Sequence, residues 1–413
     1  MTVIRVVERG RDADGRFLVR VSFEDGGDYD VTVTNPLDAV QESRLAWYFE
    51  EHLRYPFLDQ QVARQAVAER EVCGQRLFEQ VFGGSAYAEY RSWAQRAFDG
   101  CWIQVQGSAA FHRVHWEALR DPLFASPLAM RMPLTRRLDG LGARFEVAPA
   151  GETLNILVVT ARPDGARDVG YRTVSRPLLD GLGRANRPVQ VELVRPGTWA
   201  ALRDRLRELT RAHGSGYVHV VHFDMHGALA PFDAIERGRA GGRYLFREGT
   251  GEPYEGERGY LFFETDTVGQ AHPVTAAQAE LLAEHRVPVA VLNACQSAKE
   301  SASEASLAQR LVEAGVPVTL GMAYSVTVTA VEHAMPVLYE ELSCGRPPIE
   351  ASHTARRVLF DTKARHAYFD QQLELEDWVL PVVFAQRPLR IEVQEMTPAR
   401  QAAYYTQQAA RHR

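Results

Sequence analysis

The amino-acid sequence predicts an α/β protein with a mostly parallel central sheet covered by helices on both faces, preceded by a smaller α+β region. From residue 151 onward, almost continuous apolar runs alternate with amphipathic segments. This pattern is typical of strands buried on both faces and of the helices that cover them, and it predicts a three-layer sandwich. The first 35 residues instead alternate apolar and polar side chains between turn-forming residues, which indicates an antiparallel meander.

Residues 1–150 are expected to form the N-terminal α+β region. Its elements are three strands at Val3 to Val7, Phe17 to Phe23 and Tyr29 to Thr34, helices at Leu37 to Leu53 and Gln60 to Phe82, and a strand at Cys101 to Gln106. The aromatic and acidic patch from Val114 to Pro122 is interpreted as packing between the two halves of the protein. We expect this region to have a regulatory or docking role.

Residues 151–394 are expected to form the main domain, followed by a helical tail at 395–413. The predicted strands are Leu154 to Thr160, Val189 to Val194, Tyr217 to Phe223, Val287 to Leu292 and Val316 to Leu320. The predicted helices are Thr198 to Ala212, Thr275 to Glu284, Glu304 to Glu313, Thr327 to Leu342 and Ile349 to Phe360. Strands alternating with helices in this way build parallel sheets.

One connection in the main domain is unusually long. It runs from Ala228 to Val274 and is rich in glycine and arginine, which indicates either a functional or a disordered segment. Its arginines, which are the expected cleavage points, are Arg237, Arg239, Arg243, Arg247 and Arg258.

Composition limits the classes of partner and compartment. With 47 basic and 53 acidic side chains, the net charge of -6 argues against direct binding to nucleic acid or to an anionic membrane. No run of 18 apolar residues predicts a spanning helix. The four cysteines are scattered, without zinc-ligand spacing, so we expect no metal, no cofactor and a reducing cytoplasm.

Two predicted strand ends carry chemistry. The strand Tyr217 to Phe223 leads to His226, and the strand Val287 to Leu292 leads to Cys295. In such sheets the loops at the carboxyl ends of the strands hold reactive groups, and an imidazole activates a thiol by taking its proton. Gly227 lacks a side chain, so its amide and the amide of Cys295 are the expected donors to an oxyanion.

Alternative interpretations of these residues stay open at this point. A buried cysteine at a strand end is often a packing residue. His219, His222 and His226 could instead form a metal site, although the sequence has no HExxH motif and no second ligand cluster.

The sequence resembles the CHAT family of caspase-like cysteine peptidases. The resemblance rests on the segment around His226-Gly227, on Asn293-Ala294-Cys295-Gln296-Ser297, on Ser306-Leu307-Ala308, on Ala314 to Val318 and on Gly321 to Ser325, and it extends upstream to Leu154 to Val159. It implies a caspase-like fold, His226 as general base and acid, Cys295 as nucleophile and Gly227 in the oxyanion hole. Two departures are Asn293 and Ser297, which differ from the caspase signature.

The P1 preference is less well defined. Asp224 is the nearest carboxylate that could receive a basic P1 side chain, with Asp164 and Asp266 behind it, so we expect cleavage after arginine. Arg162 argues for an acidic P1 residue instead. We add Tyr324 and Ser325 as expected substrate-binding residues.

The sequence thus predicts a regulated endopeptidase that cleaves specific protein partners and is activated by proteolytic cleavage or by partner binding. An activating protease or a regulatory protein is the expected further partner, and family habit points to a prokaryotic defence or cell-death pathway. Two other classes are a catalytically silent interaction module and a thiol acyltransferase that uses the same two residues.

Overall fold

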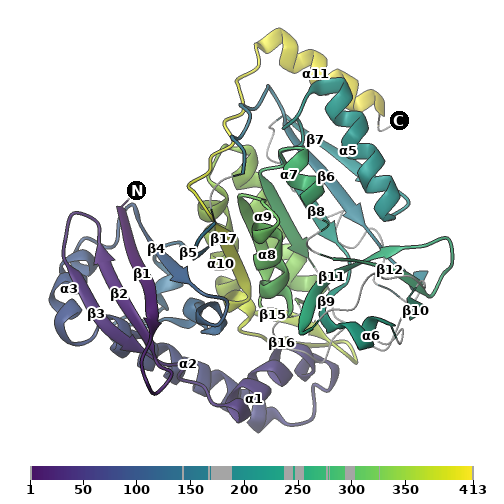
Figure 1. Ribbon diagram of the computed structural model, residues 1–413. Coiled ribbons are helices and arrows are strands. Elements are labelled where there is room, and N and C mark those ends of the chain that lie inside the picture. The colour runs from purple at the N-terminus through teal and green to yellow at the C-terminus, as the bar shows by residue number, and fades with distance from the viewer. Residues whose placement is uncertain are drawn as a thin grey trace.

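The protein is built around one large sheet that runs through both halves of the chain (Figure 1). A computed structural model describes residues 2–141, 144–165, 168, 188–236, 245–246, 255–275, 278, 280–293, 303–324 and 326–411. Within these residues the sheet has 11 strands, in the order β3-β2-β1-β4-β5-β17-β14-β13-β8-β6-β7.

The element bounds follow the sequence pattern closely. The helices are α1 Ala39–Glu50, α2 Gln60–Phe82, α3 Tyr87–Gln95, α5 Trp199–His213, α6 Phe232–Glu236, α7 Glu280–Glu284, α8 Ser303–Glu313, α9 Val328–Ser343, α10 Pro348–Asp361 and α11 Pro398–Arg411. The strands of the large sheet are β1 Thr2–Arg11, β2 Phe17–Phe23, β3 Asp28–Val33, β4 Cys101–Gly107, β5 Leu134–Leu138, β6 Leu154–Thr160, β7 Val189–Val194, β8 Val220–Asp224, β13 Val289–Asn293, β14 Val318–Met322 and β17 Pro381–Ala385.

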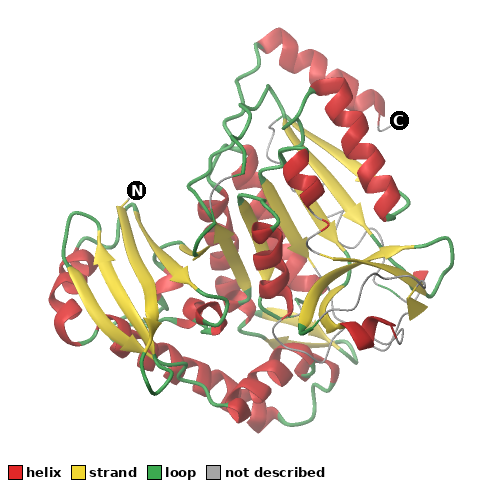
Figure 2. Ribbon diagram, viewed as in Figure 1, coloured by secondary structure: helices red, strands yellow, loops and turns green. Residues whose placement is uncertain are grey.

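Five neighbouring strands of the main domain, β7, β6, β8, β13 and β14, run parallel, and β17 pairs with β14 in the antiparallel sense. Helices cover both faces, as Figure 2 shows. Leu202, Leu206 and Leu209 of α5 pack with α7, α8 and the odd-numbered residues of β8 on one face. Helices α9 and α10 pack on the other face. The predicted α/β sandwich with a mostly parallel central sheet is therefore confirmed.

The N-terminal region shares the large sheet with the main domain. Strand β5, from the first 150 residues, pairs with β4 on one side and with β17 on the other. Beyond β4, strands β1, β2 and β3 form the predicted meander, and α2 and α3 cover it with a core of their own. The hydrogen-bonded ladder of the sheet therefore continues across the boundary between the two halves.

The long connection after residue 227 contains ordered structure. Its described residues form α6 and a four-stranded sheet in the order β10-β12-β11-β9, with β9 at Gly227–Pro231, β10 at Leu245–Phe246, β11 at Glu257–Glu264 and β12 at Gln270–Thr275. Of the two alternatives, functional or disordered, disorder does not apply to this described part, because Tyr260 to Phe263 are buried in β11. A helix was expected from Thr275, but Thr275 ends β12, and α7 begins at Glu280 within the described residues.

A short hairpin of β15 Ala364–Ala367 and β16 Gln371–Glu374 and the tail helix α11 complete the fold. The tail lies against β7, where the Tyr404 hydroxyl donates to the Val189 carbonyl at 2.6 Å. Among the described helices, none combines the length and apolar character needed to cross a membrane.

Candidate functional site

The carboxyl ends of β6, β8 and β13 lie side by side and define the candidate site. Thr160 at the end of β6 pairs in register with Asp224 of β8, which in turn pairs with Asn293 of β13. His226 lies two positions beyond Asp224, and Cys295 lies two positions beyond Asn293 in the sequence. The prediction that adjacent strands carry the histidine and the cysteine is therefore confirmed for the strands.

His226 lies at the junction of the two sheets, between the end of β8 and the start of β9. Its carbonyl accepts a hydrogen bond from the Phe262 amide of β11 at 2.9 Å. The side chain is 5% exposed. The large sheet and the small sheet thus hold the backbone of this residue from both sides.

An aspartate that the sequence did not single out contacts the imidazole. The Oδ1 atom of Asp168 lies 3.0 Å from Nε2 of His226, and the Asp168 side chain is fully buried. Its second oxygen, Oδ2, accepts from the Asp164 amide at 2.9 Å. Asp168 comes eight positions after the end of β6, and no motif or periodicity marks it.

Asp224, the expected receiver of a basic P1 side chain, is already paired with a buried arginine. Nη2 of Arg162 donates to Oδ2 of Asp224 at 2.7 Å, and Nη1 donates to the Asp224 carbonyl at 2.7 Å. Burial raises the pKa of Asp224, and the guanidinium opposes this shift. Asp224 was expected to favour a basic P1 residue and Arg162 an acidic one. In this pair their charges neutralise each other.

Gly227 has a packing reason to lack a side chain. A Cβ atom at this position would lie 2.6 Å from Cδ1 of Leu307 on α8 and 2.9 Å from the Tyr260 carbonyl oxygen of β11. Both distances are shorter than real contacts, so the small sheet and α8 can approach each other only over glycine. The role of its amide in the oxyanion hole stays a prediction, in addition to this packing role.

Tyr324 is buried at the contact between the N-terminal region and the loop after β14. Its ring lies 5.1 Å from Phe49 of α1 and stacks on His115 at 6.1 Å, and Nε2 of His115 lies 2.9 Å from Oε2 of Glu42. Burial, together with the neighbouring carboxylates of Glu42 and Glu50, raises the pKa of Tyr324 well above its usual range. This supports the interpretation of the His115 segment as packing between halves, whereas substrate binding by Tyr324 stays a prediction.

Several predicted site residues lie outside the described residues. These are Cys295, Ser325, Arg237, Arg239, Arg243 and Arg247. Arg258, in contrast, lies within β11, where it pairs in register with Ala230 of β9. Paired strands are poor protease substrates because the chain must leave its ladder, so Arg258 is a poor cleavage point.

The described cysteines make poor alternatives to Cys295 as nucleophile. Cys73 and Cys101 are buried, and burial raises the pKa of both thiols, that of Cys73 to about 12. Cys344 is exposed, at the end of α9. The end of α9 lies at the opposite edge of the sheet from the candidate site, because α9 starts next to the carboxyl end of β14 and runs back.

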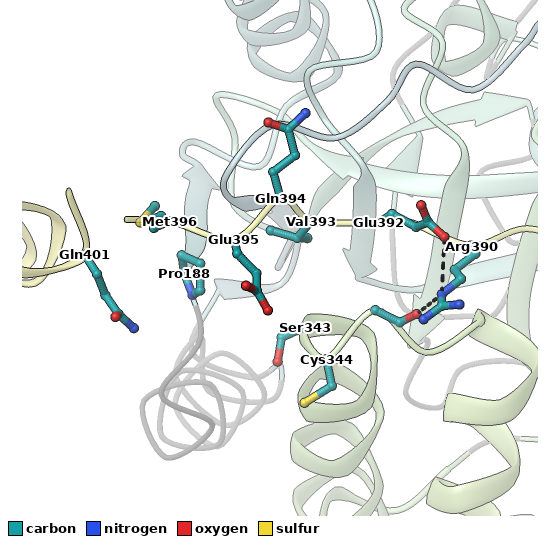
Figure 3. A pocket seen from close by; sticks show the side chains of 11 residues that line it. Pro188, Ser343, Cys344, Arg390, Glu392, Val393, Gln394, Glu395, Met396 and Gln401 are labelled. Carbon is teal, nitrogen blue, oxygen red and sulfur yellow. Dashed lines mark hydrogen bonds and ion pairs between the residues drawn. The ribbon is translucent and has the colours of Figure 1, made fainter. Parts of the chain in front are cut away.

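A pocket surrounds Cys344 at that opposite edge (Figure 3). It lies between the end of α9, Pro188 before β7, and the segment Arg390 to Met396, where Nε of Arg390 donates to the Gly345 carbonyl at 2.9 Å. None of the predicted site residues lines this pocket, so it is separate from the candidate site.

Two other histidines, His219 just before β8 and His222 within it, have structural roles. Nδ1 of His219 accepts from the Asn155 amide at 3.0 Å, and Nδ1 of His222 lies 2.7 Å from the Tyr339 hydroxyl. In the part of the chain that the structure describes, no three His, Cys, Asp or Glu side chains are grouped to hold a metal ion. The alternative of a histidine metal site therefore has no support in the described residues.

Asn293 is a further polar residue at the site that the sequence marked only as a departure from caspases. It is fully buried at the end of β13, and neither its Oδ1 nor its Nδ2 has a hydrogen-bond partner among the described residues. Leaving such atoms unpaired costs about 1–3 kcal/mol each.

The fold and the strand ends together define an α/β protein with a histidine presented at the switch between two sheets. The CHAT domain family model matches residues 101–398. The chain therefore belongs to the CHAT domain family, as its motifs predicted. The match includes β4 and β5, which lie in the region that the sequence assigned to the N-terminal half.

Comparison with solved structures finds a chain in the crystal structure of the Saccharomyces cerevisiae separase-securin complex. The two share 10% sequence identity with a TM-score of 0.42, over 94% of this chain and 30% of that chain. This chain thus spans less than a third of that one. No match was found among the curated proteins.

Proposed function

We propose that the protein is a cysteine endopeptidase that cleaves specific protein partners, with Cys295 as nucleophile and His226 as general base and acid. The observation that carries the proposal is the register of β8 and β13, which brings the strand ends that precede these two residues side by side. Membership of the CHAT domain family supports it.

The chemistry follows the usual thiol route. The proton of the Cys295 thiol passes to His226, and the thiolate forms a bond to the carbonyl carbon of the scissile peptide. The C–N bond then breaks while His226 returns the proton to the leaving amine. Water, activated by the same imidazole, hydrolyses the thioester and restores the thiol. The amides of Gly227 and Cys295 are proposed to stabilise the oxyanion.

Regulation by a partner is supported by the contact at Tyr324. Helix α1 reaches the loop after β14 through Phe49 and through Glu42 with His115. A protein that binds the N-terminal region could therefore shift the loop that carries Tyr324 and Ser325, both proposed to contact substrate.

We also propose a role in a prokaryotic defence or cell-death pathway, which rests on the family alone.

Identification of new protein termini tests the proposed activity. Active protein added to a lysate of the source cell is expected to create a small set of new amino termini that the Cys295→Ala variant does not create.

We propose arginine at P1, recognised by Asp224 if its pair with Arg162 opens, or by Asp164 or the exposed Asp266. Acidic P1 residues would contradict this preference but not the activity.

Other outcomes of this experiment separate the remaining classes. Absence of new termini, together with a Cys295 thiol that iodoacetamide does not modify, would support a catalytically silent interaction module. Transfer of an acyl group to lysate proteins without cleavage would support a thiol acyltransferase. Either result would contradict the proposed peptidase.

A cut in the segment between β9 and β11 is the second expected product. Incubation of the purified protein is expected to produce a new amino terminus after Arg237, Arg239, Arg243 or Arg247, and not after Arg258, because Arg258 lies within β11. Amino-terminal sequencing of the fragments checks this, with Cys295→Ala as the control for cleavage by the enzyme itself. Full activity of a chain that stays intact between residues 228 and 274 would rule out activation by cleavage.

A further inference from the structure

We propose that Asp168 is a positioning residue of the catalytic centre and that its carboxylate fixes the tautomer and orientation of His226. The inference rests on the proposed chemistry of Cys295 and His226. Its basis is the 3.0 Å contact between Oδ1 of Asp168 and Nε2 of His226, made by two side chains that are almost completely buried.

The contact determines which ring nitrogen exchanges a proton with the nucleophile. An ionised carboxylate only accepts hydrogen bonds, so Nε2 of a neutral His226 carries the proton and donates to Asp168. The lone pair is then on Nδ1, and Nδ1 is the atom that takes the proton of the Cys295 thiol. Once Nδ1 is protonated, the ring is positively charged and the buried carboxylate stabilises it. Asp168 thus favours the thiolate without contacting the substrate.

The loop that carries Asp168 is tied to the small sheet. The Gly269 amide in the turn between β11 and β12 donates to the Pro163 carbonyl at 2.7 Å. At the end of β11, the Glu264 carboxylate accepts from the Arg162 amide at 2.8 Å through Oε1 and from the Gly197 amide at 2.9 Å through Oε2. The sheet formed by the long connection therefore holds both the backbone of His226 and the loop that orients its ring.

A purely structural role for Asp168 is the competing explanation. Its Oδ2 accepts the Asp164 amide at 2.9 Å, which by itself would order the loop. Asparagine at position 168 has the same shape and keeps one acceptor oxygen, but it has no charge to stabilise the imidazolium. A structural role predicts a change in stability, whereas a positioning role predicts a change in the pH dependence of the thiol.

The test compares Asp168→Asn with an exposed control, Asp204→Asn on α5, whose side chain is 68% exposed. Both are made in a Cys344→Ser background, so that the exposed thiol does not react. The rate of Cys295 alkylation by iodoacetamide and kcat/KM for one peptide are measured from pH 5 to 9. For Asp168→Asn we expect kcat/KM to fall about 10²- to 10⁴-fold through kcat, with KM little changed.

The pH profiles decide between the two roles. In Asp168→Asn the acid limb of the alkylation profile is expected to move to higher pH, and Asp168→Glu is expected to restore part of its position. The inference would be overturned if the acid limb of the alkylation profile did not move in Asp168→Asn while its thermal midpoint equalled that of the control. If Asp168→Asn does not fold, the acid limb of the alkylation profile is compared between Asp168→Glu and the control, and the same criterion applies. Loss of activity in Cys295→Ala but not in Asp168→Asn would keep the proposed function and refute only this role.

Discussion

Replacing His226 with alanine is expected to lower kcat/KM for a peptide substrate by about 10⁴-fold or more. Two steps lose their catalyst together. Without the imidazole, an ordinary thiol with a pKa near 8.5 is mostly protonated at neutral pH, and the leaving amine has no proton donor. The measurement is kcat/KM on a peptide that matches a terminus created by the active protein, together with the alkylation rate of Cys295.

A matched control separates this loss from a general effect of removing a histidine. His366 is exposed on the β15–β16 hairpin, so His366→Ala is expected to keep full activity. The carbonyl of residue 226 still accepts the Phe262 amide in His226→Ala, but the buried Asp168 carboxylate loses its contact with the imidazole, so the thermal midpoint should fall and activity is measured well below it. Unchanged peptidase activity in His226→Ala would refute the proposed dyad, even if Cys295→Ala were inactive.

The parallel core could be predicted from sequence because its signal is local. Strands β6 and β7 have the predicted bounds, since β6 is a mostly apolar run and β7 alternates apolar and polar residues, each between polar turns. Helix α2 also has its predicted bounds, and Gly83 follows its last residue. Strands β8 and β13, after which the site residues were expected, could be found in the same way because both are buried, mostly apolar runs.

The remaining features depend on contacts between residues far apart in the sequence. Strand β5 pairs with β17 at one register position, Arg136 with Phe384, and nothing in either segment marks the other. The strand at Tyr260 to Phe263 was not predicted, because glycines and arginines surround this short apolar run in the sequence. Asp168 and Arg162 are ordinary loop residues until the fold places them against His226 and Asp224, so charge pairing at the site was the least predictable feature.

Acid is expected to destabilise the protein well above the range in which its surface carboxylates titrate. His112, His219 and His222 are buried, and burial lowers their pKa values to about 3, 4 and 3. In the unfolded chain they titrate near 6.5. The unfolded state therefore binds more protons between pH 6.5 and about 4, and stability present above pH 6.5 is lost as the pH falls. At pH 5 each histidine lowers the free energy of unfolding by about 2 kcal/mol, and the three together lower it by about 6 kcal/mol. The whole free energy of unfolding of a typical protein is about 5–15 kcal/mol.

Carboxylates with raised pKa values oppose this loss. Burial raises the pKa of Glu50 to about 7, so the folded state also takes up a proton in this range. Burial raises the pKa values of Asp224 and Asp377 in the same direction. A variant that removes one histidine isolates the effect. Tyr339 contacts His222 across the core, so His222→Leu with Tyr339→Phe replaces both polar partners by apolar groups and should change stability little at pH 7.5.

Relative to the unsubstituted protein, this double variant is expected to gain about 1.4 kcal/mol per pH unit as the pH falls from 6.5 toward 4, because one histidine no longer takes up a proton on unfolding. Urea unfolding at half-unit steps of pH measures the difference. Parallel pH dependences for the two proteins would mean that His222 takes up its proton at the same pH in the folded and unfolded states. That result would contradict the neutral, buried imidazole at the centre of β8, on which the packing of α9 against the sheet depends.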